Sequence, residues 1–362
     1  AAASVAAASA AASAAPSAPA ERRSARVAFK GGETYVVGGV EYSKLEMIGR
    51  GGTSQVFRVL SPNGKVLALK QVKLDADPSL LQAVQNEIEL LQLFKERGLN
   101  EHIIELVGSE VKMEEQLIHM VMESGEIDLA HLFARQTREG GSLNESFVCM
   151  YWHQMLRAVH TIHEARVIHG DLKPANFLCV QGSLKLIDFG IAKQSNCDTT
   201  KIARDSQVGT VNYMSPEAIT DMGSESDCPE NLLKLGRASD VWSLGCILYQ
   251  MVHGHTPFSH LRTIYQKLQA IPDERKKIKF PPLRNPHLQD VIQKCLQRQP
   301  AKRPSIPELL AHPLLRPELR EESPPAPAPA PAPAPGGVSF EQLSMVIEQV
   351  SRAMGGSVDP EV

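Results

Sequence analysis

The sequence predicts an α+β fold of two lobes, a small sheet-rich lobe with one prominent helix followed by a larger, mainly helical lobe. Apolar runs of strand length dominate residues 39–123, whereas apolar residues from Asn144 onward recur mostly at helical spacing. No apolar run approaches the roughly 18 residues of a membrane span. Two lobes of this kind leave a cleft between them, and such clefts are the usual place for a ligand.

The composition narrows the classes of partner. Hydrophobic residues make up 43% and charged residues 22% of the 362 positions, as is typical of soluble globular proteins. The net charge of −3 gives no reason to expect a nucleic-acid or membrane partner, and we expect neither. No two of the six cysteines form a CxxC pair, which indicates reduced thiols in a cytosolic or nuclear compartment.

The N-terminal part of the chain divides at a change in composition. Residues 1–38 are rich in Ala and Ser, and we expect a disordered segment there. An organellar transit peptide is the alternative, which we disfavour because the chain begins with Ala rather than Met. We expect one folded domain over residues 39–317, with its small lobe at 39–123 and its large lobe at 124–317.

The C-terminal part divides in the same way. Residues 318–337 are a Pro-Ala-rich linker, which we expect to form a stiff polyproline II spacer. Residues 338–355 carry apolar side chains at i, i+3, i+4 and i+7, which predicts an amphipathic helix. A helix this short is marginal alone, so it either needs a partner or is a frayed tail. Residues 356–362 are expected to be disordered.

The first elements of the small lobe read as strands. They are Leu45–Ile48, Gln55–Leu60 and Lys65–Lys73, and the string SPNG at 61–64 predicts the turn between the last two.

A helix and two further strands complete the small lobe. Asp77 is a candidate N-cap, and the helix that follows is expected to end near Arg97, because Gly98 can terminate it. The two further strands are expected around Ile103–Val111 and Leu117–Met122.

A glycine-rich string on the first hairpin is a candidate phosphate loop. Residues 49–56 read GRGGTSQV, and glycines let backbone N–H groups approach phosphates closely. The signal is weak alone, because glycine turns are common and Ser54 stands where a third motif glycine is expected.

A lysine and a glutamate downstream predict a buried ion pair. Lys70 ends an apolar strand, where a lysine is costly to bury unless it meets an anion. Glu87 shares its helical face with apolar side chains that point inward, so we expect it to pair with Lys70. The alternative for Glu87 is an ordinary surface glutamate.

Two strings further along the chain carry the chemistry. Residues 169–178 read HGDLKPANFL and residues 184–190 read LKLIDFG. Phosphoryl transfer needs a carboxylate to orient the incoming hydroxyl, a role that suits Asp171. It also needs oxygen ligands for Mg²⁺, a role that suits Asn176 and Asp188.

With Lys70 and Glu87, these strings resemble the eukaryotic protein kinase superfamily from about Tyr42 to Arg316. The resemblance implies a bilobal protein kinase fold that binds ATP and Mg²⁺ in its cleft. It implies that Lys173 marks serine/threonine specificity. The residues that it assigns to the nucleotide site are Ile48, Gly49, Gly51, Val56, Ala68, Lys70, Glu87, Met122 at the back of the pocket, Glu123 and Gly125 of the hinge, and Leu178.

The resemblance also implies structural roles outside the nucleotide site. Glu217 would close the activation segment and pair with Arg303, and Asp240 would begin a buried helix of the large lobe. The plain alternatives are a surface charge for Arg303 and a helix N-cap for Asp240. Thr210 would face Asp171 and shape the substrate shelf, unless it is only a structural threonine in a turn.

Longer strings narrow the resemblance to the monopolar spindle kinases, also called TTK kinases. The strings are VHTIH at 159–163, DLKPANFL at 171–178, DTT at 198–200, DSQVGTVNYM at 205–214 and IPELLAHP at 306–313. Ser215 and the insert at 221–237 depart from that family's pattern.

That narrower resemblance implies a dual-specificity kinase that acts mainly on Ser and Thr, and also on Tyr. It implies autophosphorylation at Thr199 and Thr200, with Thr210 as a further acceptor, through a transient dimer. Its partners would be kinetochore and spindle-checkpoint proteins. A location in the nucleus and cytoplasm, and at kinetochores in mitosis, is expected from the resemblance alone.

Gly170 stands where many kinases carry an arginine that an activating phosphate neutralises. We hypothesise that a phosphate at Thr199 or Thr200 would need other cations here. The candidates are Lys193, Lys201 and Arg204. The alternative is that Gly170 fits a tight turn and that packing orders the loop.

Three other functions compete with a protein kinase. A pseudokinase scaffold would bind partners without transferring phosphate, which the complete set of catalytic residue types argues against. A module dominated by the C-terminal helix is a second alternative. A small-molecule kinase is a third, which Lys173 and the long activation segment disfavour.

Overall fold

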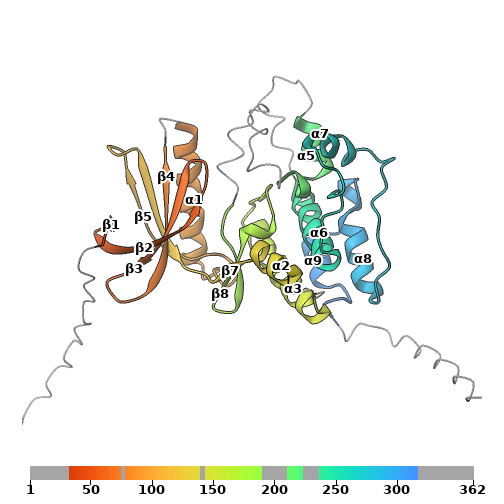
Figure 1. The fold of residues 1–362 in the computed structure, drawn as a ribbon, viewed down its shortest axis with the longest axis horizontal. Helices are drawn as coiled ribbons and strands as arrows, with labels where there is room; N and C mark the ends of the chain where they lie inside the picture. The colour runs from red at the N-terminus through yellow and green to blue at the C-terminus, as the bar shows by residue number, and fades with distance from the viewer. Residues whose placement is uncertain (1–31, 75–77, 139–142, 190–209, 223–235, 317–362) are drawn as a thin grey trace, which may run out of the picture. The chain divides into compact units, whose positions relative to one another are not determined.

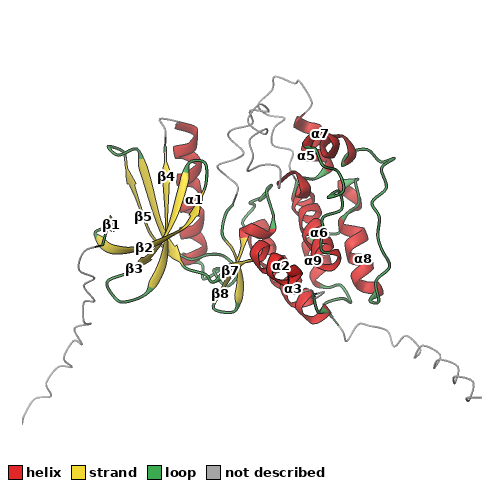
Figure 2. Ribbon diagram, in the orientation of Figure 1, coloured by secondary structure: helices red, strands yellow, loops and turns green. Residues whose placement is uncertain are grey.

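The computed structural model describes residues 32–74, 78–138, 143–189, 210–222 and 236–316. Within this part the predicted α+β fold is confirmed, and Figures 1 and 2 show a sheet-rich lobe that precedes a helical lobe. None of the described helices is both long and apolar enough to cross a membrane. The C-terminal linker and helix that we expected lie outside the described residues.

The small lobe is built on a six-stranded sheet. Its strands are β1 (Thr34–Val37), β2 (Val40–Arg50), β3 (Ser54–Leu60), β4 (Val66–Lys73), β5 (Leu106–Lys112) and β6 (Leu117–Glu123). The spatial order is β1-β2-β3-β4-β6-β5, and every neighbouring pair is antiparallel. The predicted turn between β3 and β4 is present, and Gly64 adopts a φ of +79° there.

The first strand corrects our N-terminal boundary. β1 lies inside the segment 1–38 that we expected to be disordered, so that boundary is wrong at its C-terminal end. Gly38 and Gly39 have φ of +60° and +76°, which makes them the two central residues of a tight hairpin turn. Val37 therefore pairs with Val40. The glycine pair is thus a turn between two strands and not the boundary of the folded domain.

Helix α1 (Pro78–Glu96) packs on the sheet and carries Glu87. Its buried positions recur at helical spacing, and Glu87 lies among them with 2% exposure. The helix ends as predicted, because Gly98 adopts a φ of +65° just after it. The expected N-cap Asp77 lies outside the described residues.

The large lobe is mainly helical, as predicted. Its longer helices are α2 (Leu129–Arg138), α3 (Glu145–Glu164), α6 (Arg237–His253) and α8 (Pro286–Cys295), and its shorter helices are α5 (Pro216–Met222), α7 (Ile264–Ala270) and α9 (Ile306–Leu310). Asn144 caps α3, because its side chain accepts a hydrogen bond of 2.9 Å from the Ser146 amide.

A small three-stranded sheet, which the sequence pattern did not predict, supports the catalytic strings. Its strands are β7 (Ile127–Asp128), β8 (Phe177–Val180) and β9 (Ser183–Leu186). Strands of two to four residues are too short to show an alternating pattern. This hairpin joins the two strings at 169–178 and 184–190, so it fixes the distance between them.

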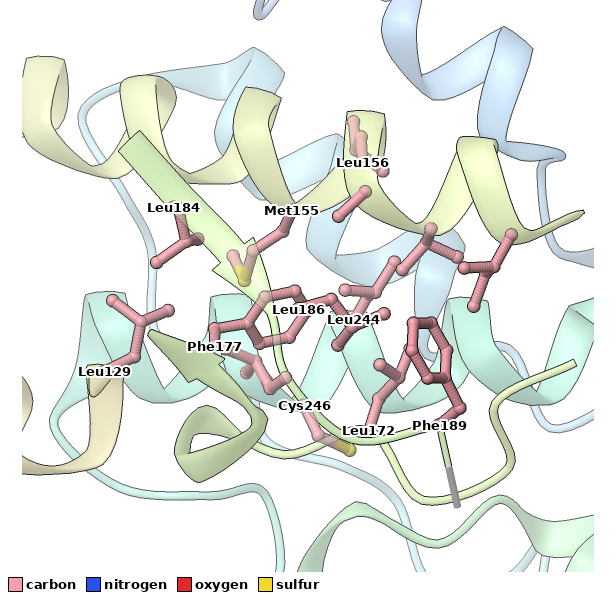
Figure 3. Packing of buried hydrophobic residues seen from close by; sticks show 14 of the residues in the cluster. Leu129, Met155, Leu156, Leu172, Phe177, Leu184, Leu186, Phe189, Leu244 and Cys246 are labelled. Carbon is pink, nitrogen blue, oxygen red and sulfur yellow. The ribbon is translucent and has the colours of Figure 1, made fainter. Parts of the chain in front are cut away.

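The core of the large lobe holds this hairpin in place. Figure 3 shows side chains from α3 and α6 meeting Phe177 and Leu186 of the hairpin. Trp152 of α3 and Trp242 of α6 are fully buried in the same core. Burying one such large apolar side chain contributes about 1.5–3 kcal/mol to the free energy of unfolding. The hairpin therefore packs against a stable part of the core.

Candidate active site

Asp240, at the start of α6, anchors the loop that carries Asp171. Its side chain is fully buried and accepts hydrogen bonds from the backbone amides of His169 (3.0 Å) and Gly170 (2.9 Å). The Nε2 atom of His163 lies 2.8 Å from the same carboxylate. The plain alternative of a helix N-cap is wrong, because Gly236 is the N-cap of α6 and Asp240 lies in its first turn. The Asp240 carboxylate instead fixes the backbone of the catalytic loop.

His169 joins this loop to the residues around Asp188. Its Nδ1 accepts a hydrogen bond of 3.1 Å from the Asp171 amide, so its Nε2 carries the proton and donates to the Asp188 carbonyl. Burial lowers the pKa of His169 below its ordinary value, and the neighbouring carboxylates oppose this shift only in part. The neutral imidazole thus holds the two strings together.

This depressed pKa predicts that stability falls in mild acid. Below about pH 6.5 the unfolded chain binds a proton at His169 that the folded chain does not, so the unfolded state gains stability. We expect the free energy of unfolding, measured by urea denaturation, to decrease from pH 7.5 to about 5.5. In a His169→Asn variant the decrease should be shallower. Equal slopes in the two proteins would contradict this assignment.

Lys173 lies between the candidate catalytic carboxylate and the substrate shelf. Its Nζ is 3.1 Å from Oδ2 of Asp171 and 3.4 Å from Oγ1 of Thr210. Thr210 belongs to the short helix η3 (Thr210–Tyr213) that follows the part of the activation segment outside the described residues. The expected contact of Thr210 with Lys173 is therefore present, and Lys173 links Thr210 to Asp171.

Lys70 and Glu87 form the predicted ion pair. The Nζ of Lys70 lies 3.2 Å from Oε1 of Glu87, and both side chains are largely buried. Burial alone would lower the pKa of Lys70, but the carboxylates of Glu87 and Asp188 outweigh it and hold the pKa above its ordinary value. Lys70 is therefore a stable cation that faces both carboxylates.

Phe189 couples the position of α1 to that of Asp188. Its fully buried ring lies 5.8 Å from the ring of Phe94 on α1, centroid to centroid. Since Phe189 follows Asp188 directly and Phe94 shares a helix with Glu87, movement of α1 would displace both carboxylates that face Lys70.

Most of the residues assigned to the nucleotide site lie on β2, β3, β4 and β6. The β-ladder places Val56 opposite Lys70 and Ala68 opposite Met122. The glycine string bridges β2 and β3, and the Gly51 amide donates a 2.7 Å hydrogen bond to the Ser54 carbonyl. Ile48 and Gly49 lie at the end of β2, where the Ile48 side chain is exposed.

The hinge residues Glu123 and Gly125 are in close contact with other parts of the protein. The Glu123 carboxylate accepts hydrogen bonds from Nζ of Lys185 (2.6 Å) and from the Glu105 amide (2.8 Å), so its side chain is engaged by the protein itself. A Cβ at Gly125 would lie 2.4 Å from the Leu178 side chain and 2.5 Å from the Cys179 carbonyl oxygen. Only glycine fits there without a shift of the backbone.

Asn176 and Asp188 supply oxygen atoms of the kind that hard divalent cations prefer. The Asn176 amide nitrogen donates to the Asp171 carbonyl (3.2 Å), which orients the side-chain oxygen away from that bond. No group of three His, Cys, Asp or Glu side chains converges to hold a metal anywhere in the described ranges. The two donors Asn176 and Asp188 would leave other positions of a divalent cation open to the phosphate oxygens of a nucleotide.

Glu217 and Arg303 form the second predicted ion pair, with two parallel hydrogen bonds. The guanidinium donates to Oε1 and Oε2 of Glu217 at 2.7 and 2.8 Å. The same guanidinium lies 5.1 Å above the ring of Trp242. Arg303 is fully buried in this position, so the surface-charge alternative is wrong.

Gly170 adopts a φ of +71°, a left-handed conformation that favours glycine. We expect Gly170→Ala to lower the free energy of unfolding by about 1–2 kcal/mol, because Cβ strains this conformation. Gly170→Asn should lower the free energy of unfolding less, since asparagine tolerates the left-handed conformation better than alanine does. Gly108→Ala, at a glycine with open space and ordinary φ, is the matched control. Equal effects at the two glycines in urea denaturation would contradict the strain.

This conformation supports the tight-turn interpretation of Gly170. Thr199, Thr200 and the candidate cations of the phosphate hypothesis lie outside the described residues.

The sequence interpretation missed residues that act as supports. They are His163 on Asp240, Lys185 on Glu123, and Ser239, whose hydroxyl lies 2.8 Å from that of the buried Ser215. Each joins a partner that is at least 24 positions away in the chain. The available signal was the presence of polar residues among apolar neighbours on a helix or a strand, which does not name the partner.

Comparison with known proteins places this site in a family. The family model described as "Protein kinase domain" matches residues 42–315. The serine/threonine-protein kinase mph1 of Schizosaccharomyces pombe is 47% identical over 305 residues, which are 79% of this chain and 44% of that protein. The dual specificity protein kinase TTK of Mus musculus is 47% identical over 285 residues, 78% of this chain and 32% of that protein.

A third relative is less similar in sequence than the first two. The serine/threonine-protein kinase MPS1 of Saccharomyces cerevisiae is 38% identical over 288 residues, which cover 76% of this chain and 37% of that protein. The chain spans less than half the length of each of these three relatives. The chain belongs to the protein kinase family, and it resembles the Mps1, Mph1 and TTK kinases over most of its length.

Proposed function

We propose that this chain is an active kinase that transfers the γ-phosphate of ATP to Ser and Thr, and also Tyr, of protein substrates. Membership of the family implies the use of ATP and a divalent cation in general. The observation that carries the proposal is the position of Lys173 Nζ, 3.1 Å from the Asp171 carboxylate and 3.4 Å from the Thr210 hydroxyl. A catalytic carboxylate is thereby held beside the substrate shelf.

In the proposed reaction Asp171 orients the acceptor hydroxyl and takes up its proton. The hydroxyl oxygen forms a bond to the γ-phosphorus as the bond from that phosphorus to the β,γ-bridging oxygen breaks, and ADP leaves. The ammonium group of Lys173 lies beside Asp171. There it would stabilise the negative charge that accumulates on the transferred phosphoryl group.

Lys70 would orient the phosphates of the nucleotide, with Glu87 holding the lysine in place. Asn176 and Asp188 would hold Mg²⁺, which neutralises phosphate charge when it is bound. The Phe189–Phe94 contact supports this assignment, because it keeps Asp188 and α1 in one arrangement.

We also propose a role in spindle-checkpoint signalling at kinetochores, with kinetochore and checkpoint proteins as substrates. The proposal includes autophosphorylation at Thr199, Thr200 and Thr210 through a transient dimer, and a location in the nucleus and cytoplasm. The support is the identity of 47% to a dual specificity kinase named TTK, together with the strings described above.

The test is to incubate the purified chain with ATP and Mg²⁺, and to map phosphorylated residues by mass spectrometry. We expect phosphate on Ser and Thr of added protein substrates and on the activation segment, and none with Asp188→Ala. Nucleotide binding without phosphate transfer by the unaltered chain would support the pseudokinase alternative. Omission of Mg²⁺, with and without Mn²⁺ in its place, tests the choice of cation.

A further inference from the structure

The connection between α7 and α8 carries a dense group of basic side chains. Residues 272–284 read PDERKKIKFPPLR, with five cations and two carboxylates and thus a net charge of +3, in a chain whose net charge is −3. Figure 1 shows this connection as a long loop between the two helices. The five cations are all exposed, and they are Arg275, Lys276, Lys277, Lys279 and Arg284. We call residues 272–284 the basic loop.

The backbone of the basic loop is held by the body of the lobe. The Tyr249 hydroxyl of α6 donates a 2.9 Å hydrogen bond to the Lys279 carbonyl. Arg298 donates to the carbonyls of Ile271, at 2.9 Å, and Lys276. Because these bonds fix the main chain, the lysine side chains are attached to an ordered backbone. A ligand would therefore not lose binding free energy by ordering the loop.

The side chains of this segment alternate in direction. Ile278 and Phe280 are partly buried and pack on the core of the lobe, whereas Lys277 and Lys279 are exposed. Residues two apart in an extended chain lie about 6.5–7 Å from each other on one side. The pattern of exposure thus places Lys277 and Lys279 on one side of the segment, as alternate side chains of an extended peptide are placed.

Among the described residues, Arg275 is the one cation of the five that forms an ion pair. Arg275 donates to both carboxylate oxygens of Asp273, at 2.9 and 3.2 Å. The other four cations of the basic loop form no ion pair with any residue in the described ranges. By contrast, Lys294 on the adjacent helix pairs with Asp290 at 2.7 Å. The basic loop is therefore a surface with an excess of positive charge.

We propose that the basic loop binds an acidic, extended segment of a partner protein, apart from the catalytic residues. Complementary charge and the spacing of Lys277 and Lys279 fit carboxylates at alternate positions of such a segment. The loop offers no large exposed hydrophobic side chain that could stack on bases or enter a membrane. The negative net charge of the whole chain disfavours nucleic acids and anionic membranes as well.

The test is a binding measurement on the full chain without ATP, so it does not depend on the proposed kinase activity. The probe is a fluorescent peptide of alternating Glu and Gly, followed by anisotropy at about 50 mM salt. The charge reversal Lys277→Glu with Lys279→Glu should weaken binding about tenfold or more. Added salt should weaken binding to the unaltered chain, because the charges are exposed.

Two controls separate this surface from a general effect of charge. Lys65→Glu with Arg138→Glu changes the net charge equally at exposed positions outside the loop, and it should alter binding less than about twofold. Lys277→Arg with Lys279→Arg should retain binding, and thermal unfolding checks that each variant folds. Equal losses in the two reversal variants would overturn the proposal. Tighter binding of a single-stranded oligonucleotide or of anionic vesicles than of the peptide would also overturn it.

Discussion

Replacing Asp171 with asparagine is expected to lower kcat for peptide phosphorylation by about 10²- to 10⁴-fold. Asparagine keeps the shape of the side chain but cannot accept the proton of the acceptor hydroxyl. Lys173 would also lose its 3.1 Å ion pair, so its bond to Thr210 would change with it. Steady-state kinetics with a Ser/Thr peptide give kcat, and titration with a fluorescent ATP analogue gives the nucleotide affinity.

The nucleotide affinity should be nearly unchanged, because Lys70 and Glu87 meet on β4 and α1 and do not involve Asp171. Asp273→Asn, at a partly buried carboxylate that pairs with Arg275 outside the candidate site, is the matched control and should leave kcat unchanged. A kcat that stays within a few-fold of the original would show that Asp171 is not the catalytic carboxylate. A parallel loss of nucleotide affinity would instead indicate a collapsed site.

The sequence predicted those parts of the site that lie in continuous strings. Asp171, Asn176 and Asp188 stand at fixed short spacings, so their types and order were enough to indicate phosphoryl transfer. The pair of Lys70 and Glu87 was also predictable, because a buried charge requires a counter-charge and few candidates were available.

The supports of the site were not predictable to the same degree. Asp240 was expected to begin a buried helix, but its three donors come from residues about 70 positions earlier in the chain. A buried carboxylate reveals that it has partners and not which ones. The engagement of Glu123 by Lys185 was missed for the same reason, since both residues also suit a solvent-exposed position.

Two features of the fold were missed because their elements are short. β1 has four residues and ends at a glycine pair that reads equally well as a linker. The hairpin of β8 and β9 lies within the catalytic strings, where functional residues interrupt the apolar alternation. In both places the pairing of strands, which is a long-range property, decides the structure.

Arg303 is expected to contribute the largest single effect on stability. Arg303→Met should lower the free energy of unfolding by about 3–5 kcal/mol, because it leaves the Glu217 carboxylate without its bidentate partner. Three carbonyls, those of Gln297, Ala238 and Arg298, would lose donors at the same time. Urea denaturation measures the loss.

The control for Arg303 is another arginine with the same kind of bond in a different environment. Arg275 also makes two hydrogen bonds to one carboxylate, that of Asp273, but its side chain is 90% exposed, whereas that of Arg303 is fully buried. Arg275→Met should therefore leave the free energy of unfolding nearly unchanged, since solvent replaces the lost partner. Adding Glu217→Gln to Arg303→Met should cost little more, because the first change already breaks the pair. If the two arginine variants lost equal stability, burial would not be the reason that the pair of Arg303 and Glu217 holds the end of the activation segment against α6.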